Sequence, residues 1–271
     1  MKTANLAWLF DVDGVLTNSE KKKITEPAIL EELISLLKKN EPVALVTGRS
    51  GSFMSRQVIE PLASKIKDVH ILQNFIAVGE KGAVITTFEN GDLKTFTTKD
   101  FAIPRDLEEE VNKLVEEKYS NWMFIDETKE TMISVEMKDG LSIQNFTPYQ
   151  HQLDSNLEEL LNAPEFENKF KIVSSRISTD IQDIIVGKDY ATEKVLQWLQ
   201  KRKIVPKKFI CFGDSGQDID MARYIYEQGL PVEFVFVGEE HLLDKEDYPF
   251  PVVLTHQPCE KGTLEYLIHD T

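Results

Sequence analysis

Two aspartates stand at the end of the first apolar segment of the chain. Residues 6–10 read LAWLF, a run typical of a strand buried on both faces, and Asp11 and Asp13 follow it. Side chains two positions apart in an extended chain point to opposite faces, so the backbone must turn for both carboxylates to reach one site. Gly14 favours such a turn. One carboxylate can then attack phosphorus while the other exchanges a proton with a leaving group or water, and a dication would reduce the repulsion between carboxylate and phosphate. The alternative is a strand-to-turn junction without chemistry.

A second acidic cluster follows the apolar residues 209–212 (FICF), in the segment Gly-Asp-Ser-Gly-Gln-Asp. Asp214 and Asp218 are one helical turn apart if a helix begins there, and such spacing can serve a hard cation and its water shell. The alternative is that Asp214 or Ser215 caps the helix that follows.

A third polar cluster follows residues 43–46 (VALV), where Thr47, Gly48 and Arg49 stand in sequence. A hydroxyl, free backbone amides and a guanidinium can surround a phosphoryl group, although a helix-capping turn would use the same residues. All three clusters follow predicted parallel strands. Open α/β sheets bind ligands at the carboxyl edge of their strands, so the three clusters are expected to form one site.

The order of apolar segments predicts the elements that carry these clusters. Strands and helices alternate at both ends of the chain, which indicates a parallel sheet with right-handed crossovers. The middle of the chain differs, because hairpins alternate with helices there. Its expected elements are a hairpin over 76–98, a helix over 105–118, two strands within 122–137, a helix over 149–162, and strands near 170–174 and 181–186. The last third is expected to hold helices over 191–202 and 217–228, and strands over 209–212, 232–237 and 251–255.

The fold class is therefore α/β, with a Rossmann-like, doubly wound parallel sheet and an inserted α+β cap. Residues 1–80 and 187–271 are expected to form the discontinuous core, and residues 81–186 the cap. With 271 residues, 41% of them hydrophobic, the chain is long enough for two ordinary domains.

The composition limits the classes of binding partner and the cellular compartment that we expect. A formal net charge of −15 disfavours nucleic acid and anionic membrane surfaces. The chain has no apolar stretch near the roughly 18 residues of a membrane span. Its two cysteines, Cys211 and Cys259, have no metal-ligand spacing and are interpreted as reduced thiols, which favours a cytoplasmic setting.

The three motifs together resemble those of the haloacid dehalogenase superfamily of phosphatases. They occur in that family's order over Asp11–Thr17, Thr47–Arg49 and Gly213–Asp218. The segment VGEKGAVI (78–85) is similar to the entry to the large cap of the type IIB, or Cof-like, branch. That branch includes sucrose-, trehalose- and mannosylglycerate-phosphate phosphatases.

The resemblance implies a role for each matching residue. Asp11 would be the nucleophile and a Mg²⁺ ligand. Asp13 would be the general acid and base, with its backbone carbonyl as a second ligand. Thr47 would donate a hydrogen bond to the transferring phosphoryl group. Asp214 would be the third protein ligand of the metal, supported by Asp218.

Two positions depart from the family pattern. The asparagine that usually precedes the last aspartate is Gln217 here, which adds a methylene and puts direct metal contact in doubt. The family's lysine is expected near 191–192, which are Ala and Thr, and Lys188 and Lys194 flank them. Lys188 is favoured, because it lies after a glycine at the predicted sheet edge, but both lysines remain candidates. One cation is required between Asp11 and the phosphoryl oxygens.

The expected activity is Mg²⁺-dependent hydrolysis of a phosphomonoester through an aspartyl-phosphate intermediate. The expected partner is a small phosphorylated metabolite, a sugar phosphate by resemblance to the branch. Gly48, Arg49 and Lys81 are the candidates for substrate binding, and the cap is expected to select the leaving group. Two alternatives remain: a sugar phosphomutase of the same branch, and a non-catalytic metabolite-binding regulator.

Overall fold

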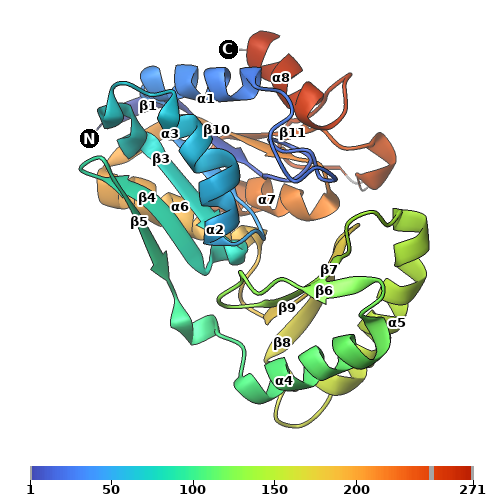
Figure 1. Cartoon of the computed structure of the whole chain (residues 1–271). Helices are drawn as coiled ribbons and strands as arrows, with labels where there is room; N and C mark the ends of the chain where they lie inside the picture. The colour runs from blue at the N-terminus through green and yellow to red at the C-terminus, as the bar shows by residue number, and fades with distance from the viewer. Residues whose placement is uncertain (1, 244–246, 270–271) are drawn as a thin grey trace. The chain divides into compact units, whose positions relative to one another are not determined.

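The computed structural model describes residues 2–243 and 247–269, and these form two compact units (Figure 1). The first unit takes the described residues up to Phe96 and again from Gly187 onward. The second unit is the continuous segment Thr97–Val186. Each unit has its own sheet and its own apolar core.

The first unit is built on an eight-stranded sheet in the order β12-β11-β10-β1-β2-β3-β4-β5. The six strands from β12 to β3 pair in parallel, and β4 pairs antiparallel with β3. In sheet order the strands are β12 (Val252–Leu254), β11 (Val232–Phe236), β10 (Ile204–Gly213), β1 (Lys2–Phe10), β2 (Val43–Val46), β3 (Phe75–Gly79), β4 (Val84–Glu89) and β5 (Asp92–Thr97).

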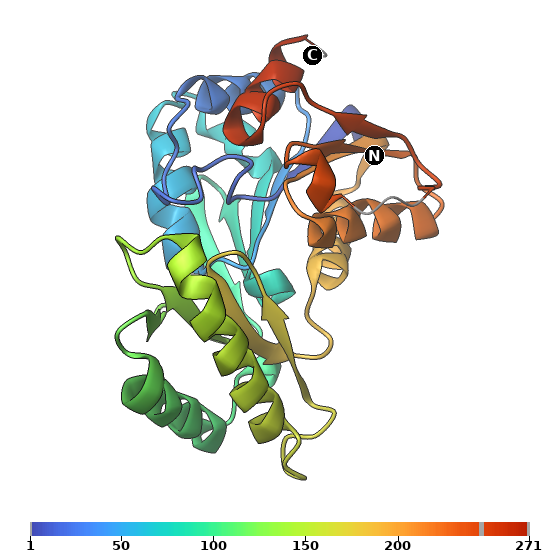
Figure 2. The same cartoon turned by 90° about the vertical axis from the view of Figure 1, so that its right-hand side faces the viewer.

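Helices cover both faces of this sheet, which explains why its central strands are apolar on both sides (Figures 1 and 2). Trp8 and Phe10 of β1 pack in the same core cluster as α1 and α8, whereas Ala7 and Leu9 pack in the cluster with α6 and α7. The helices are α1 (Ala28–Lys38), α2 (Gly51–Met54) continued by a π-helical turn η1 (Ser55–Ile59) into α3 (Glu60–Ser64), α6 (Lys188–Arg202), α7 (Ile219–Glu227) and α8 (Cys259–His269). The doubly wound α/β core expected from the sequence is therefore confirmed.

The first boundary between the units differs from the expected one. The sequence places it between residues 80 and 81, whereas the structure places it after Phe96. The reason is strand pairing: β4 continues the large sheet by pairing with β3, with Ile76 opposite Thr87, and β5 extends the same edge. The second boundary lies before Gly187.

The second unit is an α+β layer of its own. Its four-stranded sheet has the order β6-β7-β9-β8 and is antiparallel throughout. Apolar side chains of α4 and α5 pack with those of the sheet in one cluster that includes Phe146, Val135 and Ile181. The elements are α4 (Arg105–Leu114) with a π-helical turn η5 (Val115–Tyr119), β6 (Met123–Ile125), β7 (Ile133–Met137), α5 (Ile143–Leu161), β8 (Phe170–Ser174) and β9 (Ser178–Asp183).

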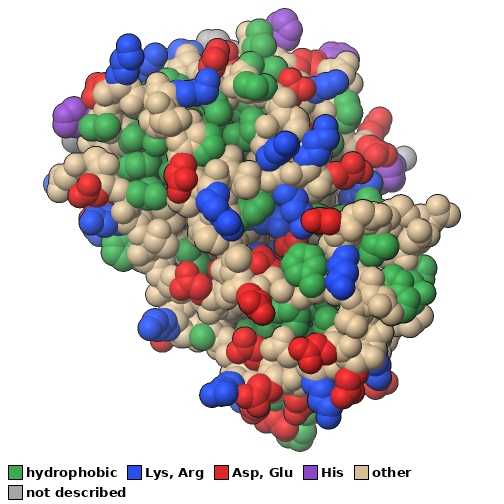
Figure 3. Space-filling model, viewed as in Figure 1, with side chains coloured by type: hydrophobic (Ala, Val, Ile, Leu, Met, Phe, Trp, Pro, Cys, Tyr) green, Lys and Arg blue, Asp and Glu red, His purple; other side chains and the backbone are tan. Residues whose placement is uncertain are grey.

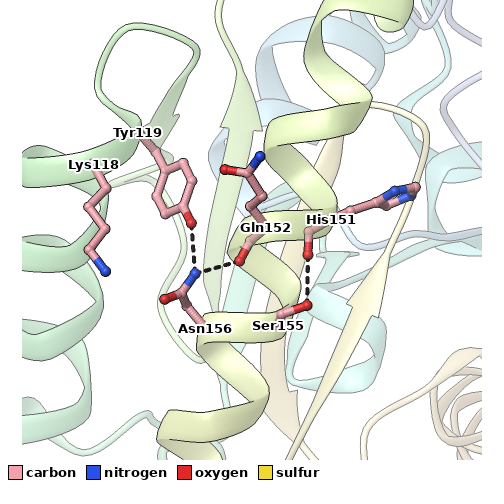
Figure 4. A pocket seen from close by; sticks show the side chains of 6 residues that line it. All are labelled: Lys118, Tyr119, His151, Gln152, Ser155 and Asn156. Atoms are coloured by element: carbon pink, nitrogen blue, oxygen red, sulfur yellow. Dashed lines mark hydrogen bonds between the residues drawn. The ribbon is translucent and has the colours of Figure 1, made fainter.

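A shallow hollow of about 530 Å³ lies between η5 and α5 of the second unit (Figure 4). The amide nitrogen of Asn156 donates to the hydroxyl of Tyr119 at 2.8 Å and to the backbone carbonyl of Gln152 at 2.6 Å. The hollow is lined by Lys118, Tyr119, His151, Gln152, Ser155 and Asn156. None of these residues is a candidate site residue from the sequence.

The visible surface in Figure 3 carries acidic and basic side chains interspersed with one another, without a large field of one sign. Within the described ranges, no helix combines the length and apolar composition that a membrane span requires.

Candidate active site

The three sequence motifs meet at the carboxyl edge of β10, β1 and β2, which are neighbours in the sheet. Asp11 directly follows β1, and its backbone amide donates to the carbonyl of Phe212 at 3.0 Å. Thr47 follows β2, and Asp214 follows β10. Because β1 lies between strands from the two ends of the chain, the motifs converge at a topological switch point, where open α/β sheets bind ligands.

Lys188 places a cation beside Asp11 and Asp218 at this edge. Its Nζ lies 2.7 Å from Asp11 Oδ1 and 2.6 Å from Asp218 Oδ1, and it donates to the carbonyl of Val46 at 2.8 Å. Burial opposes its charge, but attraction by Asp11 and Asp218 outweighs burial and raises the pKa of Lys188. Lys188 therefore stays charged beside the expected nucleophile.

Lys194, the other candidate from the sequence, is placed elsewhere. Its ammonium group lies 4.1 Å from the ring centroid of Tyr190, further along α6. Of the two lysines, only Lys188 joins the carboxylate cluster among the interactions recorded for the described residues. The role of Lys188 in neutralising the phosphoryl group stays a prediction.

Asp218 forms hydrogen bonds with the two residues that follow β10, Asp214 and Ser215. Its Oδ2 accepts hydrogen bonds from the backbone amides of Asp214 and Ser215, at 3.2 and 3.0 Å, and from the Ser215 hydroxyl at 2.7 Å. The capping interpretation of this motif is confirmed, since Ser215 and Asp218 form a capping box, whereas the cation-binding interpretation stays a prediction. The signal for it, a serine three positions before an aspartate, was visible in the sequence.

Three carboxylates of this edge could together hold a metal ion. Asp11, Asp214 and Asp218 can each offer an oxygen atom such that all three lie within 4.8 Å of one another. Carboxylate oxygens are hard ligands of the kind that Mg²⁺ prefers. The donor set fits the ion that the motifs imply, although Asp218 already holds Lys188, and its metal contact stays a prediction. Gln217 is exposed, and its part in metal binding stays open as well.

The electrostatics of the cluster favour a bound cation. Burial raises the pKa of Asp11 to about 7, with repulsion from Asp218 and Asp13 adding to burial and Lys188 opposing it. Burial also raises the pKa of Asp214 to about 8, and repulsion from Asp218 and Asp11 adds to it. A single ammonium group does not offset the charge of three close carboxylates. The negative charge that remains would be neutralised by a dication.

Magnesium binding is therefore expected to depend on pH in a defined direction. The ligands must be ionised, and since the pKa values of Asp11 and Asp214 are raised, protons occupy them below about pH 7 to 8. We expect the Mg²⁺ affinity to rise between pH 6 and pH 9, with proton release on binding, as titration calorimetry in buffers of different ionisation enthalpy will show. Asp214→Asn should lose most of this binding. Equal affinity at both ends of this range, without proton release, would contradict the assignment.

Gly14 makes the turn that joins the motif carboxylates. Its φ is +73°, in the left-handed region that glycine favours, and its amide donates to the carbonyl of Thr17 at 2.8 Å. A Cβ at this position would lie 2.1 Å from Oδ2 of Asp214. The turn expected from the sequence is confirmed, and it also needs the absence of a side chain.

Gly14→Ala is expected to damage both stability and metal binding. The new methyl group must displace Asp214, so we expect a loss of about 2–4 kcal/mol in the free energy of unfolding. Added Mg²⁺ should raise the melting temperature of this variant much less than that of the wild-type protein. Gly140→Ala is the matched control: its φ is +84°, but no atom lies within 4 Å of the added Cβ. It should lose about 1 kcal/mol from backbone strain and keep the full Mg²⁺ effect. Equal effects of the two variants would show that the contact with Asp214 is unimportant.

Hydrogen bonds connect the loops that carry Thr47, Arg49 and Lys81. The Thr47 hydroxyl accepts the Arg49 amide at 3.1 Å, and the Thr47 carbonyl accepts the Lys81 amide at 3.0 Å. The Lys81 carbonyl in turn accepts the amide of Gly187, which precedes Lys188. The loops carrying Thr47, Lys81 and Lys188 are therefore tied to one another by their backbones. Substrate binding by Gly48, Arg49 and Lys81 stays a prediction.

The side chain of Arg49 has a partner that the sequence did not reveal. Its Nε donates to Asp13 Oδ2 at 2.7 Å and its Nη2 to Asp13 Oδ1 at 3.2 Å. The two residues are 36 positions apart on separate loops, and no spacing pattern connects them. Asp13 and Asp11 thus have different cationic partners, Arg49 and Lys188.

Comparison with known proteins places this site in a family. The family model of haloacid dehalogenase-like hydrolases matches residues 8–197. Comparison with curated protein sequences finds no match.

Similar solved structures cover almost the whole chain. The C-terminal domain of Candida albicans trehalose-6-phosphate phosphatase has a TM-score of 0.69 at 16% identity, covering 97% of this chain and 90% of its own. The sucrose-phosphatase of a Synechocystis species, in complex with sucrose and phosphate, has a TM-score of 0.57 at 17% identity, covering 99% and 98%. The IMP-nucleotidase of Plasmodium falciparum has a TM-score of 0.54 at 15% identity, covering 98% and 70%. At these identities the likeness concerns the fold, whereas the family model spans well over half of the sequence, including the Asp11 and Thr47 motifs and Lys188. The chain belongs to the haloacid dehalogenase-like hydrolases.

Proposed function

We propose that the protein is a Mg²⁺-dependent phosphomonoester hydrolase that forms an aspartyl-phosphate on Asp11. One observation supports the proposal above the others: Asp11, at the end of the central strand, is paired with the buried Lys188 and lies beside Asp214 and Asp218. A carboxylate held next to a fixed cation, in a group of hard oxygen ligands, suits attack on an anionic phosphate.

The proposed reaction has two steps. In the first, an oxygen of Asp11 bonds to phosphorus, the ester P–O bond breaks, and Asp13 gives its proton to the departing alkoxide. In the second, Asp13 takes a proton from water as the water oxygen bonds to phosphorus, which frees Asp11 and releases inorganic phosphate. Lys188 offsets charge between Asp11 and the phosphoryl oxygens, and the Thr47 hydroxyl donates to one of them. Bound Mg²⁺, held by Asp11, Asp214 and the Asp13 carbonyl, would supply further charge neutralisation.

The proposed substrate is a small phosphorylated metabolite, and a sugar phosphate in the first instance. Two of the similar structures are named as phosphatases of trehalose-6-phosphate and of sucrose phosphate, which supports a sugar leaving group. The third is a nucleotidase, so nucleoside monophosphates belong in the test. We assign selection of the leaving group to the second unit.

The test is phosphate release from a panel of sugar phosphates, nucleoside monophosphates and an aryl phosphate, each with Mg²⁺ or with EDTA. The proposal predicts Mg²⁺-dependent release, fastest with a sugar phosphate, and little release by Asp214→Asn. Interconversion of sugar phosphate isomers without net release would favour a mutase. A folded protein that binds Mg²⁺ yet acts on no compound would favour a metabolite-binding regulator.

A further inference from the structure

The carboxylate of Asp13 is held at both of its oxygens by one side chain. Arg49 donates from Nε to Oδ2 at 2.7 Å and from Nη2 to Oδ1 at 3.2 Å. A planar guanidinium that binds both oxygens fixes the plane of a carboxylate as well as its position, which an ammonium group cannot do. Each carboxylate oxygen can accept more than one hydrogen bond. The grip of Arg49 therefore leaves Asp13 able to face a reacting atom.

Arg49 is itself held in place on three sides. Its backbone amide donates to the Thr47 hydroxyl at 3.1 Å, and its carbonyl accepts the amide of Glu80 at 3.1 Å. The guanidinium carbon lies 4.5 Å from the ring centroid of Phe53, on α2. That helix begins at a cap in which the Ser50 hydroxyl accepts the Phe53 amide at 3.2 Å. With Arg49 7% exposed, its guanidinium has a defined direction before any substrate arrives.

We propose that Arg49 is a positioning residue for Asp13: it holds the Asp13 carboxylate in the plane and direction that proton transfer requires. This inference rests on the proposed function and differs from the expectation that Arg49 binds substrate. The turn over Asp11–Thr17 fixes the Asp13 backbone but leaves its side-chain torsions free. Arg49 removes that freedom, and misplacement of a catalytic group by about 1 Å can lower a rate by roughly 100-fold.

The two steps of the reaction distinguish positioning from substrate binding. Asp13 must protonate an alkoxide in the first step, but p-nitrophenolate leaves without protonation. In the second step every substrate needs Asp13 to take a proton from water. Loss of a positioning Arg49 should therefore spare the first step with p-nitrophenyl phosphate and slow the second. Loss of a substrate-binding Arg49 should weaken binding and slow the first step with all substrates.

The experiment compares Arg49→Ala with wild type by stopped-flow and steady-state kinetics. With p-nitrophenyl phosphate, we expect a rapid burst of p-nitrophenolate, close to one per protein molecule, followed by turnover lowered roughly 100-fold. With an alkyl phosphate, the first step should slow as well. Added guanidinium should restore part of the second step, and Arg49→Lys should recover less than half of the lost rate because an ammonium group cannot make the two parallel hydrogen bonds that set the plane of the carboxylate.

The matched control is Arg56→Ala, which removes an exposed arginine from the same helical segment and should leave both steps unchanged. If Arg49→Ala does not fold, Phe53→Leu should show the same pattern in weaker form, since it loosens the guanidinium alone. A variant with no burst, or one with a raised KM and unchanged kcat, would overturn the positioning role. A wild-type protein without phosphatase activity would overturn the proposed function and this inference together.

Discussion

Asp11→Asn is expected to abolish phosphate release from a protein that still folds. The amide is nearly the same size as the carboxylate, but it has no charge and cannot attack phosphorus, so we expect kcat to fall by at least about 10³-fold. Lys188 keeps a partner in the variant, because Asp218 lies 2.6 Å from its Nζ. The melting temperature should therefore stay close to that of wild type or rise slightly, since a buried carboxylate with a raised pKa has been removed.

The measurement is phosphate release at saturating substrate together with a thermal melt. Asp189→Asn is the matched control, because Asp189 is exposed and adjoins Lys188 in sequence without taking part in the carboxylate cluster. It should retain full activity. Full activity in Asp11→Asn would exclude Asp11 as the nucleophile.

Lys188→Ala is expected to lower both stability and activity. The substitution leaves Asp11 and Asp218 buried without their shared cation, and breaking a buried ion pair costs about 3–5 kcal/mol. Turnover should fall by roughly 100-fold or more, because the charge between nucleophile and phosphoryl group is gone. Lys194→Ala is the matched control on the same helix, and it should cost less than about 1 kcal/mol, since it removes one cation–π contact.

The stability of Lys188→Ala should also depend on pH. Without Lys188, which lowers the pKa of Asp11, that pKa should lie above its wild-type value of about 7. An acid whose folded pKa is raised loses stability as the pH rises from its unfolded pKa toward its folded pKa, so the variant should be more stable at pH 6 than at pH 8. If Lys188→Ala and Lys194→Ala have equal stability and turnover, Lys188 does not neutralise charge beside Asp11.

The sequence was sufficient to predict the sheet edge that carries the site. The apolar runs before Asp11, Thr47 and Asp214 identify buried strands, and buried parallel strands place their carboxyl ends together. It was insufficient to choose between Lys188 and Lys194, because the choice depends on where α6 begins. The expected start was residue 191, whereas α6 begins at Lys188, directly after the extended Gly187.

Other boundaries moved for local reasons. Helix α5 begins at Ile143 rather than at 149, because the Ser142 hydroxyl accepts the Asn145 amide and the helix continues through Pro148. Strand β9 covers Ser178–Asp183 rather than 181–186, in register with β7. Pairing with a neighbouring strand decides where a strand begins and ends, and the sequence of one strand does not show which strand it will pair with.

The contact between Arg49 and Asp13 could not be predicted at all. Each residue belongs to a motif that explains it separately, one as a phosphate-binding arginine and the other as an acid and base. The contact arises because β1 and β2 are neighbours and their loops leave the sheet at the same edge. The sequence identified the candidate groups, and the tertiary structure decides which of them are in contact.

Trapping the covalent intermediate tests the central claim most directly. The protein is mixed with Mg²⁺ and a substrate from the panel, quenched during turnover and reduced with borohydride, which converts an aspartyl-phosphate to homoserine. Peptide mass spectrometry then reads the residue at each aspartate. We expect homoserine at position 11 in the wild-type protein and at no other position, with none after Asp11→Asn. Two results would contradict the assignment of Asp11 as the nucleophile. One is homoserine at another aspartate. The other is an unmodified Asp11 although the Arg49→Ala variant shows a burst.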